Sequence, residues 1–351
     1  MAQDGAERSR KICFDLLPKV SRTFALSIAR LKEPLKSSVC VSYLLCRILD
    51  TVEDAPGLRA AERWSLMEPL LGALREEGGL PEGWGASVAG RLASLAAPQD
   101  LELLGADADV FALFSACGES DRLAMTRWVT EMGKGMVAWS ERMGEGEGVL
   151  KTLPSLVALD RYCYYIAGTV GYLLTDLYYL HSPFVDRALY FRLQSDAEDF
   201  GLGLQKVNIV KDLAEDYGRG WCFIPQEFLQ ARGVAPADFA SDRRADAVYA
   251  AVRPVLVSAA GHLRRAWRYL SAFPREEPEI RFFLSTSLFF AIETLALIAK
   301  DPSRLTAPEK LKISRLQVAA LVASLATAAG DPASLEALYL KLSKPLEVFE
   351  A

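Results

Sequence analysis

The stretch VSYLLCRILDTVED (residues 41–54) joins a mostly apolar run to three carboxylates at its end. At about 100° per residue on an α-helix, Asp50, Glu53 and Asp54 share one face. Like charges at this spacing repel by roughly a few tenths of a kcal/mol per pair. Mg²⁺ offsets such repulsion, because it takes a few carboxylates and completes its shell with water and phosphate oxygens. The stretch therefore predicts a helix with a cation-binding face.

A second stretch, FGLGLQKVNIVKDLAED (residues 200–216), repeats this arrangement about 160 residues later. On a continuous helix, Asn208, Asp212, Glu215 and Asp216 fall within an arc of roughly 100°. Two solvated acidic faces are the alternative interpretation. We favour the cation site, because carboxylates rarely lie in such apolar stretches without a partner. Together the two clusters suggest a diphosphate held between two helices by Mg²⁺.

The amino-acid composition argues against several classes of function. The 351 residues are 51% hydrophobic, which is ample for a large core, and the net charge of −5 gives no basic field for nucleic acid. The six cysteines form no CxxC pair, which favours reduced core thiols in a cytoplasmic protein. His181 and His262 are the two histidines, far apart, so a histidine zinc site or a serine triad is not expected.

Helical periodicity dominates the chain, and alternating strand patterns are nearly absent. We therefore predict one all-α domain over residues 1–351, a helical bundle around a central cavity, with a flexible tail at about 1–9. The predicted helical segments are 24–49, 61–75, 108–143, 155–180, 196–217, 247–272, 279–299, 308–329 and 333–348.

Membrane insertion is not expected from the sequence. The first residues are polar and charged, unlike a signal peptide. The segment 282–299 is nearly long enough to span a bilayer, but it carries Glu293 near its middle. A buried core helix is the better interpretation.

Several basic residues next to the clusters have two interpretations. Arg22 can pair with phosphate through its planar fork, with Ser21 as a donor, or Ser21 can simply cap a helix. Tyr43 and Arg47 share the face of Asp50, where Arg47 is either a charge partner or a phosphate ligand. Lys211, next to Asp212, admits the same two interpretations.

Two further segments bear on chemistry. DRYCYYIAGTVG (160–171) places small residues where a helix or an apolar ligand can approach, and Tyr162 is either core packing or an aromatic face near a carbocation. The basic run KLKISR (310–315) is either a solvated face or a binding site for the phosphates of a dinucleotide. No GxGxxG follows a strand pattern, so a Rossmann site is excluded and any NADPH would lie in a helical cleft.

In combination, these motifs resemble the squalene/phytoene synthase family of head-to-head prenyltransferases. The resemblance covers about residues 12–226 and continues more weakly to Arg315. DTVED, QKxNI and the KIxR-like element resemble the squalene synthase branch more than the phytoene branch. The residues that carry it are SRTFALSI (21–28), YLLCRILDTVED (43–54), MGKGM (132–136), DRYCYYIAGTVG (160–171) and QKVNIVKDLAED (205–216).

The resemblance implies roles for particular residues. It implies Mg²⁺ ligands, or side chains supporting them, at Asp50, Glu53, Asp54, Asn208, Asp212, Glu215 and Asp216. It implies catalytic roles for Tyr162, Asp50, Asp54, Asp212 and Asp216. Substrate contacts are expected from Ser21, Arg22, Phe24, Tyr43, Arg47, Gln205, Lys211 and Arg219. NADPH contacts are expected from Asn208, Lys312 and Arg315.

Two departures from the family pattern concern loop closure and product. The family usually has a basic residue where this chain has Trp221, and Arg219 is the nearest substitute. Squalene synthases often carry Pro-Gln where this chain has Ser287 and Leu288. The shape of the second-step pocket, and so the product, depends on these positions.

The implied activity is condensation of two farnesyl diphosphates to presqualene diphosphate, followed by NADPH-dependent reduction to squalene, with Mg²⁺. A phytoene or dehydrosqualene synthase without reductant is the alternative, and a helical assembly factor is the non-enzyme alternative. We expect a cytoplasmic protein that contacts membranes peripherally through apolar helices at 282–299 or 316–328. The oligomeric state is left open, a monomer included.

Overall fold

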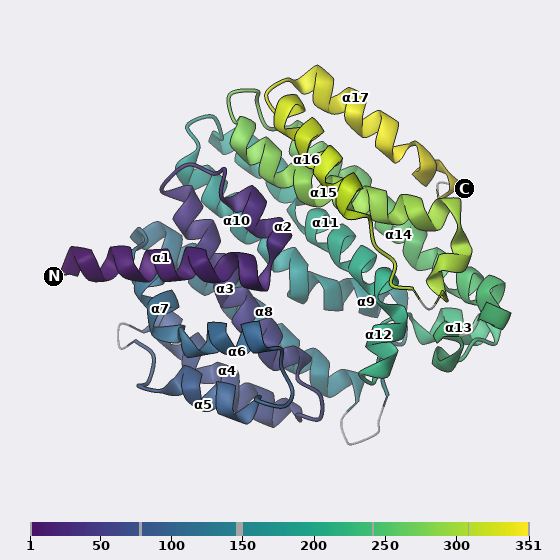
Figure 1. The fold of residues 1–351 in the computed structure, drawn as a ribbon, viewed down its shortest axis with the longest axis horizontal. Helices are drawn as coiled ribbons and strands as arrows, with labels where there is room; N and C mark the ends of the chain where they lie inside the picture. Colours follow the sequence, from purple (N-terminus) through teal and green to yellow (C-terminus); the bar gives the residue numbers. More distant parts are fainter. Residues whose placement is uncertain (1, 77–78, 145–149, 241, 308, 350–351) are drawn as a thin grey trace. The chain divides into compact units, whose positions relative to one another are not determined.

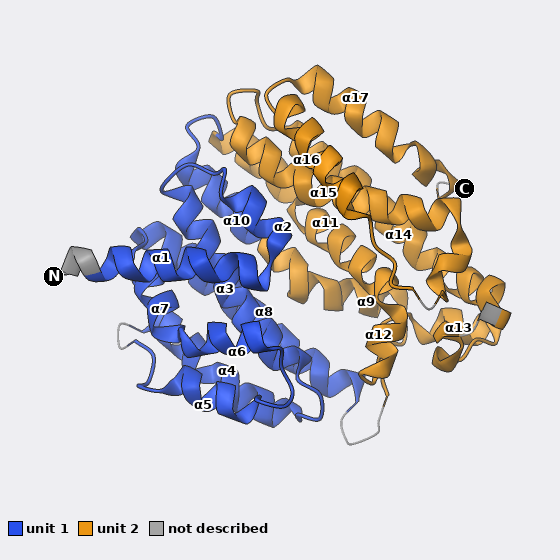
Figure 2. Cartoon of the chain, viewed as in Figure 1, with its two compact units in different colours: residues 1–146, 172–185 blue, residues 147–171, 186–351 orange. Residues whose placement is uncertain are grey.

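The computed structural model describes residues 2–76, 79–144, 150–240, 242–307 and 309–349, and within these ranges it is helical apart from two short strands (Figure 1). The all-α prediction is confirmed. The contacts divide the chain into two compact units (Figure 2): unit 1 is residues 1–146 and 172–185, and unit 2 is residues 147–171 and 186–351. A single domain over residues 1–351, with a central cavity, stays a prediction.

Unit 1 is built around α3, which carries the first acidic cluster. Leu44, Leu45, Ile48 and Leu49 are almost completely buried, and α3 packs against α1, α6, α7 and α8. Residues 172–181 of α10 also belong to this unit. Its helices are α1 (Ala2–Val20), α2 (Arg22–Ile28), α3 (Leu35–Asp54), α4 (Ala60–Arg75), α5 (Trp84–Arg91), α6 (Pro98–Gly105), α7 (Asp107–Ala116), α8 (Glu119–Met143) and α10 (Thr169–His181).

A buried arginine fixes the end of α3. Arg63 has 0% of its surface exposed, and its guanidinium donates to the backbone carbonyl oxygens of Glu53, Ala55 and Leu58. It also donates to the Ser140 hydroxyl at 2.9 Å. The last carbonyls of a helix have no partner within the helix, so Arg63 holds in place the turn that follows the acidic cluster.

Unit 2 is built on α11 and α14, which lie side by side (Figure 1). Gly203 of α11 faces Leu263 of α14, and a Cβ at Gly203 would lie 2.9 Å from Leu263 Cδ2. The helical elements of unit 2 are α9 (Leu156–Cys163), the π-helix η1 (Tyr164–Gly168), α11 (Arg187–Lys211), α12 (Leu213–Gly218), α13 (Gln226–Arg232), η2 (Pro236–Ala240), η3 (Asp242–Arg244), α14 (Ala245–Ser271), α15 (Pro278–Lys300), η4 (Pro302–Leu305), α16 (Arg315–Ala328), α17 (Pro332–Ser343) and η5 (Lys344–Phe349).

Two short strands join distant parts of unit 2. β1 (Lys151–Thr152) pairs in parallel with β2 (Trp221–Cys222), with Lys151 opposite Trp221. The pairing places the residues before α9 beside those after α12.

Helix α15 is the one helix in the described residues that is long and apolar enough to cross a membrane. Its apolar window is 78% buried, and Phe282, Phe289 and Leu295 are each at most 2% exposed. This burial agrees with the prediction of a core helix, and membrane contact through 282–299 stays a prediction.

The structure differs from the predicted elements at several places. The predicted helix 24–49 is two helices, α2 and α3, separated by residues 29–34, and α3 continues to Asp54. Helix α1 starts at Ala2, so most of the predicted tail at 1–9 is helical. The predicted helix 108–143 breaks at Cys117 and Gly118, where both residues take extended backbone angles. Residues 309–314 of the predicted helix 308–329 are not helical, because the Ser314 side chain caps α16, which starts at Arg315; residue 308 lies outside the described residues.

We predict that Gly201→Ala destabilises the protein by about 2 kcal/mol or more, because a Cβ there would overlap the carbonyl oxygen of Ala167. Gly261→Ala on α14 is the control, since its nearest neighbour would be Arg265 Nη1 at 3.8 Å. That substitution should stabilise the protein by about 0.5–1 kcal/mol. Chemical denaturation measures both changes in the free energy of unfolding. Equal effects of the two substitutions would contradict the close approach of Gly201 to Ala167.

Candidate functional site

The first acidic cluster lies in the last turns of α3, in unit 1. Asp50 is half-buried, Glu53 is buried and Asp54 is exposed. Arg47, one turn earlier, makes a two-point ion pair with Asp100 of α6, from Nε to Oδ1 and from Nη2 to Oδ2, both at 2.9 Å. Asp100 is 5% exposed. Arg47 is thus a charge partner of Asp100, a residue that the sequence analysis did not single out.

The first cluster has an excess of negative charge. Burial raises the pKa of the Asp50 carboxyl to about 7; the Asp54 and Asp100 carboxylates also raise it, and Arg47 opposes them. A raised pKa means that the charged form lacks stabilising partners. A bound cation beside Asp50 would supply what is missing.

Three other predicted residues gather near α3. The Ser21 hydroxyl accepts a hydrogen bond from the Phe24 backbone N–H at 3.2 Å, so the helix-cap interpretation of Ser21 is confirmed. The rings of Phe24 and Tyr43 lie 5.2 Å apart. Burial raises the pKa of Tyr43, and a hydrogen bond with Ser21 opposes that rise. Arg22 lies exposed on the first turn of α2.

The second acidic cluster lies in unit 2, where the chain is not the continuous helix that we predicted. Helix α11 ends at Lys211, and Asp212 has φ −108° and ψ 20°, outside regular helix. Hydrogen bonds four residues apart still continue, from Asp212 N–H to Asn208 O and from Asp216 N–H to Asp212 O. Asn208, Asp212 and Asp216 therefore keep approximately helical spacing, although the helix is interrupted at Asp212.

Every carboxylate of the second cluster has a cationic partner. Lys310 Nζ lies 2.6 Å from Glu215 Oε2 and 3.4 Å from Asp212 Oδ1, and Lys211 Nζ lies 3.2 Å from Asp212 Oδ2. Arg219 Nη2 lies 2.5 Å from Asp216 Oδ1. The hydrogen bond from Lys310 lowers the pKa of Glu215. Lys310 was part of the basic run in the sequence, but its place in this cluster was not predicted.

Tyr162 is the first of three stacked aromatic rings, here called the aromatic ladder: Tyr162, Phe223 and Trp221. The residue is 3% exposed, and its ring stacks on Phe223 with centroids 5.0 Å apart. Phe223 stacks on Trp221 at 5.3 Å, and Lys151 Nζ lies 4.0 Å from the centre of the Trp221 ring. Trp221, a departure from the family pattern, therefore takes part in this ladder. The sequence did not single out Phe223 or Lys151.

The remaining predicted residues are placed separately. Gln205 is half-buried and Asn208 exposed, both on α11, and Asn208 Oδ1 accepts from Lys211 Nζ at 3.2 Å. Lys312 and Arg315 are exposed, before and at the start of α16. Ser287 and Leu288 are buried in α15, and the Ser287 hydroxyl has no hydrogen-bond partner among the described residues.

The donor chemistry of both clusters fits a hard cation. Their side chains offer carboxylate oxygens and one amide, the ligands that Mg²⁺ prefers. In unit 2 the ammonium of Lys310 already stands between two of these carboxylates. Within the described ranges, no three His, Cys, Asp or Glu side chains converge closely enough to share a metal ion. The assignment of individual ligands therefore stays a prediction.

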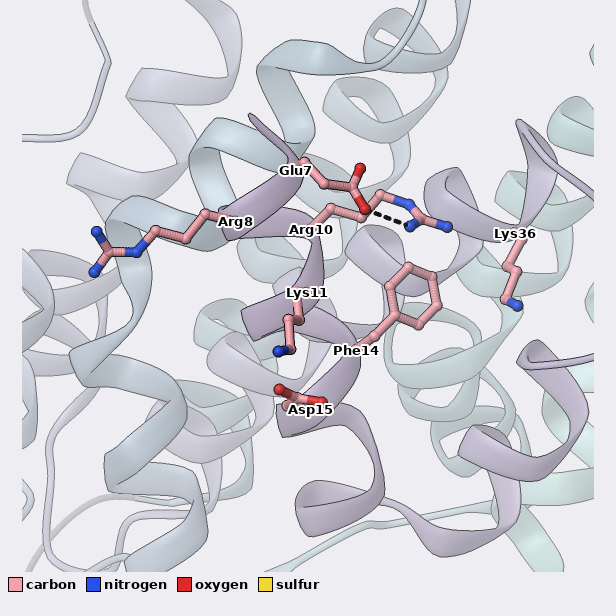
Figure 3. Close-up of a pocket in the computed structure, with 7 residues that line it drawn as sticks. All are labelled: Glu7, Arg8, Arg10, Lys11, Phe14, Asp15 and Lys36. Carbon is pink, nitrogen blue, oxygen red and sulfur yellow. Dashed lines mark hydrogen bonds and ion pairs between the residues drawn. The ribbon is translucent and has the colours of Figure 1, made fainter. Parts of the chain in front are cut away.

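A pocket on unit 1 lies apart from these residues. It is formed by α1 and Lys36, and Arg10 lies 3.4 Å from Glu7 within it (Figure 3). None of the described residues that line it belongs to the predicted site. Its lining residues are Glu7, Arg8, Arg10, Lys11, Phe14, Asp15 and Lys36.

The chain is similar to proteins of one known family. The family model for squalene/phytoene synthase matches residues 17–317. The squalene synthase of Eremothecium gossypii is 29% identical over 296 residues, covering 84% of this chain and 63% of that protein. The human squalene synthase is 28% identical, with 84% and 65% covered. The chain spans about 60–65% of the length of these relatives.

Solved structures share the fold. The structure of TcSQS with the ligand BPH1237 superposes with a TM-score of 0.80 at 23% identity, covering 97% of this chain and 96% of that one. A dehydrosqualene synthase with a bound ligand superposes with a TM-score of 0.66 at 19% identity, covering 93% and 98%. The predicted isoprenoid-synthase-like fold is confirmed.

We predict that Asp50→Asn stabilises the metal-free protein at pH 8 by about 1–3 kcal/mol. A folded-state pKa of about 7, against the ordinary 3.8, means that the folded protein holds the proton more tightly than the unfolded chain. Wild-type stability should therefore fall as pH rises from about 4 to 7, and the variant should not show this fall. Urea unfolding at pH 5 and pH 8 measures the difference.

Asp54→Asn is the control, because it removes the same charge from an exposed position on the same helix. It should change the pH dependence far less. Identical pH profiles for the wild type and Asp50→Asn would show that the Asp50 carboxyl is not electrostatically strained.

Proposed function

We propose that this chain, which belongs to the squalene/phytoene synthase family, condenses two farnesyl diphosphates to presqualene diphosphate and reduces that intermediate to squalene. The observation that carries the proposal is that both acidic segments are complete and lie within the residues matched by the family model. The cationic partners of the second cluster and the electrostatic deficit at Asp50 support the same view.

The first task of the site is to bind the diphosphate of the farnesyl donor. Mg²⁺, when bound, would neutralise diphosphate oxygens and so make the diphosphate a better leaving group. In unit 1 the residues that would hold it are Asp50, Glu53 and Asp54, and in unit 2 they are Asn208, Asp212, Glu215 and Asp216. Lys211, Lys310 and Arg219, which now pair with carboxylates, are suited to contact phosphate oxygens.

The second task is to stabilise a carbocation. Breaking the C–O bond of the first farnesyl diphosphate leaves an allylic cation, and the double bond of the second attacks it. Closing the cyclopropane ring of presqualene diphosphate releases one proton, for which the Tyr162 hydroxyl is the proposed acceptor or relay. The stacked rings of Tyr162, Phe223 and Trp221 offer π faces that favour positive charge and add no strong nucleophile.

The third task is reduction. NADPH, when bound, would supply the hydride that ends the rearrangement. Lys312 and Arg315 are exposed cations before and at the first turn of α16, which fits binding of phosphate groups, and Asn208 is an exposed amide on α11.

The alternative is a dehydrosqualene or phytoene synthase, in which the last cation loses a proton and no reductant is needed. Ser287 and Leu288 are the reason for retaining this alternative, because they replace the usual Pro-Gln in α15, where the second-step pocket is expected. A helical assembly factor is less well supported, because both acidic clusters are complete.

The product assay tests the proposal. We expect purified protein with labelled farnesyl diphosphate and Mg²⁺ to form squalene with NADPH, and presqualene diphosphate or dehydrosqualene-like products without it. Mass spectrometry identifies the products. Dehydrosqualene or phytoene as the only product with NADPH would favour the alternative enzyme, and no conversion at all would favour the assembly factor.

A charge-neutral variant provides the matched control for this assay. Asp212→Asn should slow turnover by about 100-fold or more, equivalent to about 2.7 kcal/mol in the barrier. Asp246→Asn, at an exposed position in the first turn of α14, should leave turnover unchanged. Equal turnover in the two variants would contradict a role for the second cluster.

Peripheral membrane contact is part of the proposal, because squalene is an oil. With α15 buried, α16 is the better candidate: Leu316 is 80% exposed, and no charged residue occurs between Leu316 and Gly330. We expect Leu316→Glu to reduce sedimentation with anionic liposomes. Leu123→Glu, at another apolar position that is 65% exposed, is the control. Unchanged binding of Leu316→Glu would exclude α16.

A further inference from the structure

Unit 2 contains a lysine with no exposed surface. Lys206 of α11 is 0% exposed, and its ammonium forms an ion pair with Asp160 of α9. It also lies 2.6 Å from Ser258 Oγ and 2.9 Å from His262 Nε2, both on α14. Of the three N–H donors of the ammonium, two have acceptors in Ser258 and His262, and Asp160 supplies the opposite charge. Because a buried charge is costly unless it is fully paired, this arrangement ties α9, α11 and α14 together.

Asp199 and Arg265 hold the His262 ring in place. Its Nδ1 lies 2.5 Å from Asp199 Oδ1, and Arg265 Nε donates to the same oxygen at 2.7 Å. Burial raises the pKa of Asp199, but the hydrogen bonds from His262 and Arg265 outweigh it and lower the pKa overall. Arg265 Nη2 also lies 2.8 Å from His262 Nδ1. With the ring hydrogen on Nδ1, His262 donates to Asp199 and accepts from Lys206, and Arg265 then bonds to Asp199 and not to the ring. The other tautomer would set an N–H against the ammonium and a lone pair against the carboxylate.

We propose that Lys206 is a positioning residue that sets the rotation of α9 and thereby aims Tyr162; the proposal rests on the proposed function. Asp160 precedes Tyr162 by two residues, so their side chains leave the helix about 200° apart. The Asp160 side is held by Lys206, and the Tyr162 side stacks on Phe223.

The elements next to α9 give such a restraint a role. Helix α9 has 8 residues, and the π-helix Tyr164–Gly168 follows it directly. A π-helical turn is a poor transmitter of helix rotation, because its hydrogen bonds do not continue the α-helical register. Lys206 lies on the same helix as Asn208 and Lys211, next to Asp212. One ammonium thus sets Tyr162 relative to the second acidic cluster.

A purely structural role is the competing explanation, and the chain offers a matched control for it. Arg281 of α15 is 2% exposed, and its guanidinium donates to the backbone oxygens of Phe273 at 3.0 Å and Ala329 at 2.7 Å. It is a buried cation of the same unit, but its hydrogen bonds do not reach α9. Arg281→Met therefore reports the cost of losing a buried cation alone.

The experiment compares Lys206→Met, Asp160→Asn and Arg281→Met in the full chain. Hydrogen exchange with mass-spectrometric detection follows the amides of residues 156–163, and steady-state kinetics separates kcat from KM. We expect Lys206→Met and Asp160→Asn to speed exchange in 156–163 at least tenfold and to lower kcat at least tenfold, with KM for farnesyl diphosphate within threefold of wild type. Arg281→Met should lower Tm and leave both readouts unchanged. Asp160→Asn keeps the buried lysine and changes a half-exposed side chain, so it preserves the fold.

Wild-type exchange in 156–163 for Lys206→Met or Asp160→Asn would overturn the proposal, as would faster exchange with unchanged kcat. So would Arg281→Met if it reproduced both effects. If the wild type converts no farnesyl diphosphate, the proposed function fails, and unchanged exchange in 156–163 would separately overturn the restraint on α9.

Discussion

Carboxylates on mostly apolar helices need positive charge beside them, and this requirement organises both candidate segments. In unit 1, Asp50 has Arg47 nearby, but Asp100 takes both ends of that guanidinium, and the pKa of Asp50 rises to about 7. In unit 2, Lys310, Lys211 and Arg219 pair with the second cluster. The two clusters therefore differ: the guanidinium nearest Asp50 is paired with Asp100, and the second cluster has ammonium and guanidinium groups that a metal would have to displace or share.

Buried cations support the backbone around these segments. Arg63 holds the carbonyls that follow α3, Lys206 joins α9 to α11 and α14, and Arg281 joins α15 to the end of α16. Each donates to at least two oxygen or nitrogen acceptors, as a buried cation requires. Polar interactions of this kind specify helix positions that apolar packing alone leaves less defined.

The sequence predicted those features that depend on local periodicity. The shared face of Asp50, Glu53 and Asp54 and the close approach at Gly171 follow from helical spacing, and α4, α14 and α15 were predicted almost to their ends. The break at Asp212 and the non-helical segment 309–314 were missed, because apolar spacing continues through both. The pairs Arg47–Asp100 and Lys206–Asp160 were also missed, since they join residues 46 or more positions apart and leave no local pattern. Ion pairs between residues far apart in the sequence are seen only in the tertiary structure.

The central claim is that each acidic segment binds a divalent cation when a prenyl diphosphate is present. Anomalous diffraction from crystals grown with Mn²⁺ and a non-hydrolysable farnesyl thiodiphosphate tests it most directly. We expect manganese peaks beside Asp50 and Asp54 and beside Asp212 and Asp216, each in contact with diphosphate oxygens. Bound thiodiphosphate with no manganese at either segment, or with Lys310 still paired to Glu215 and no metal nearby, would contradict the account.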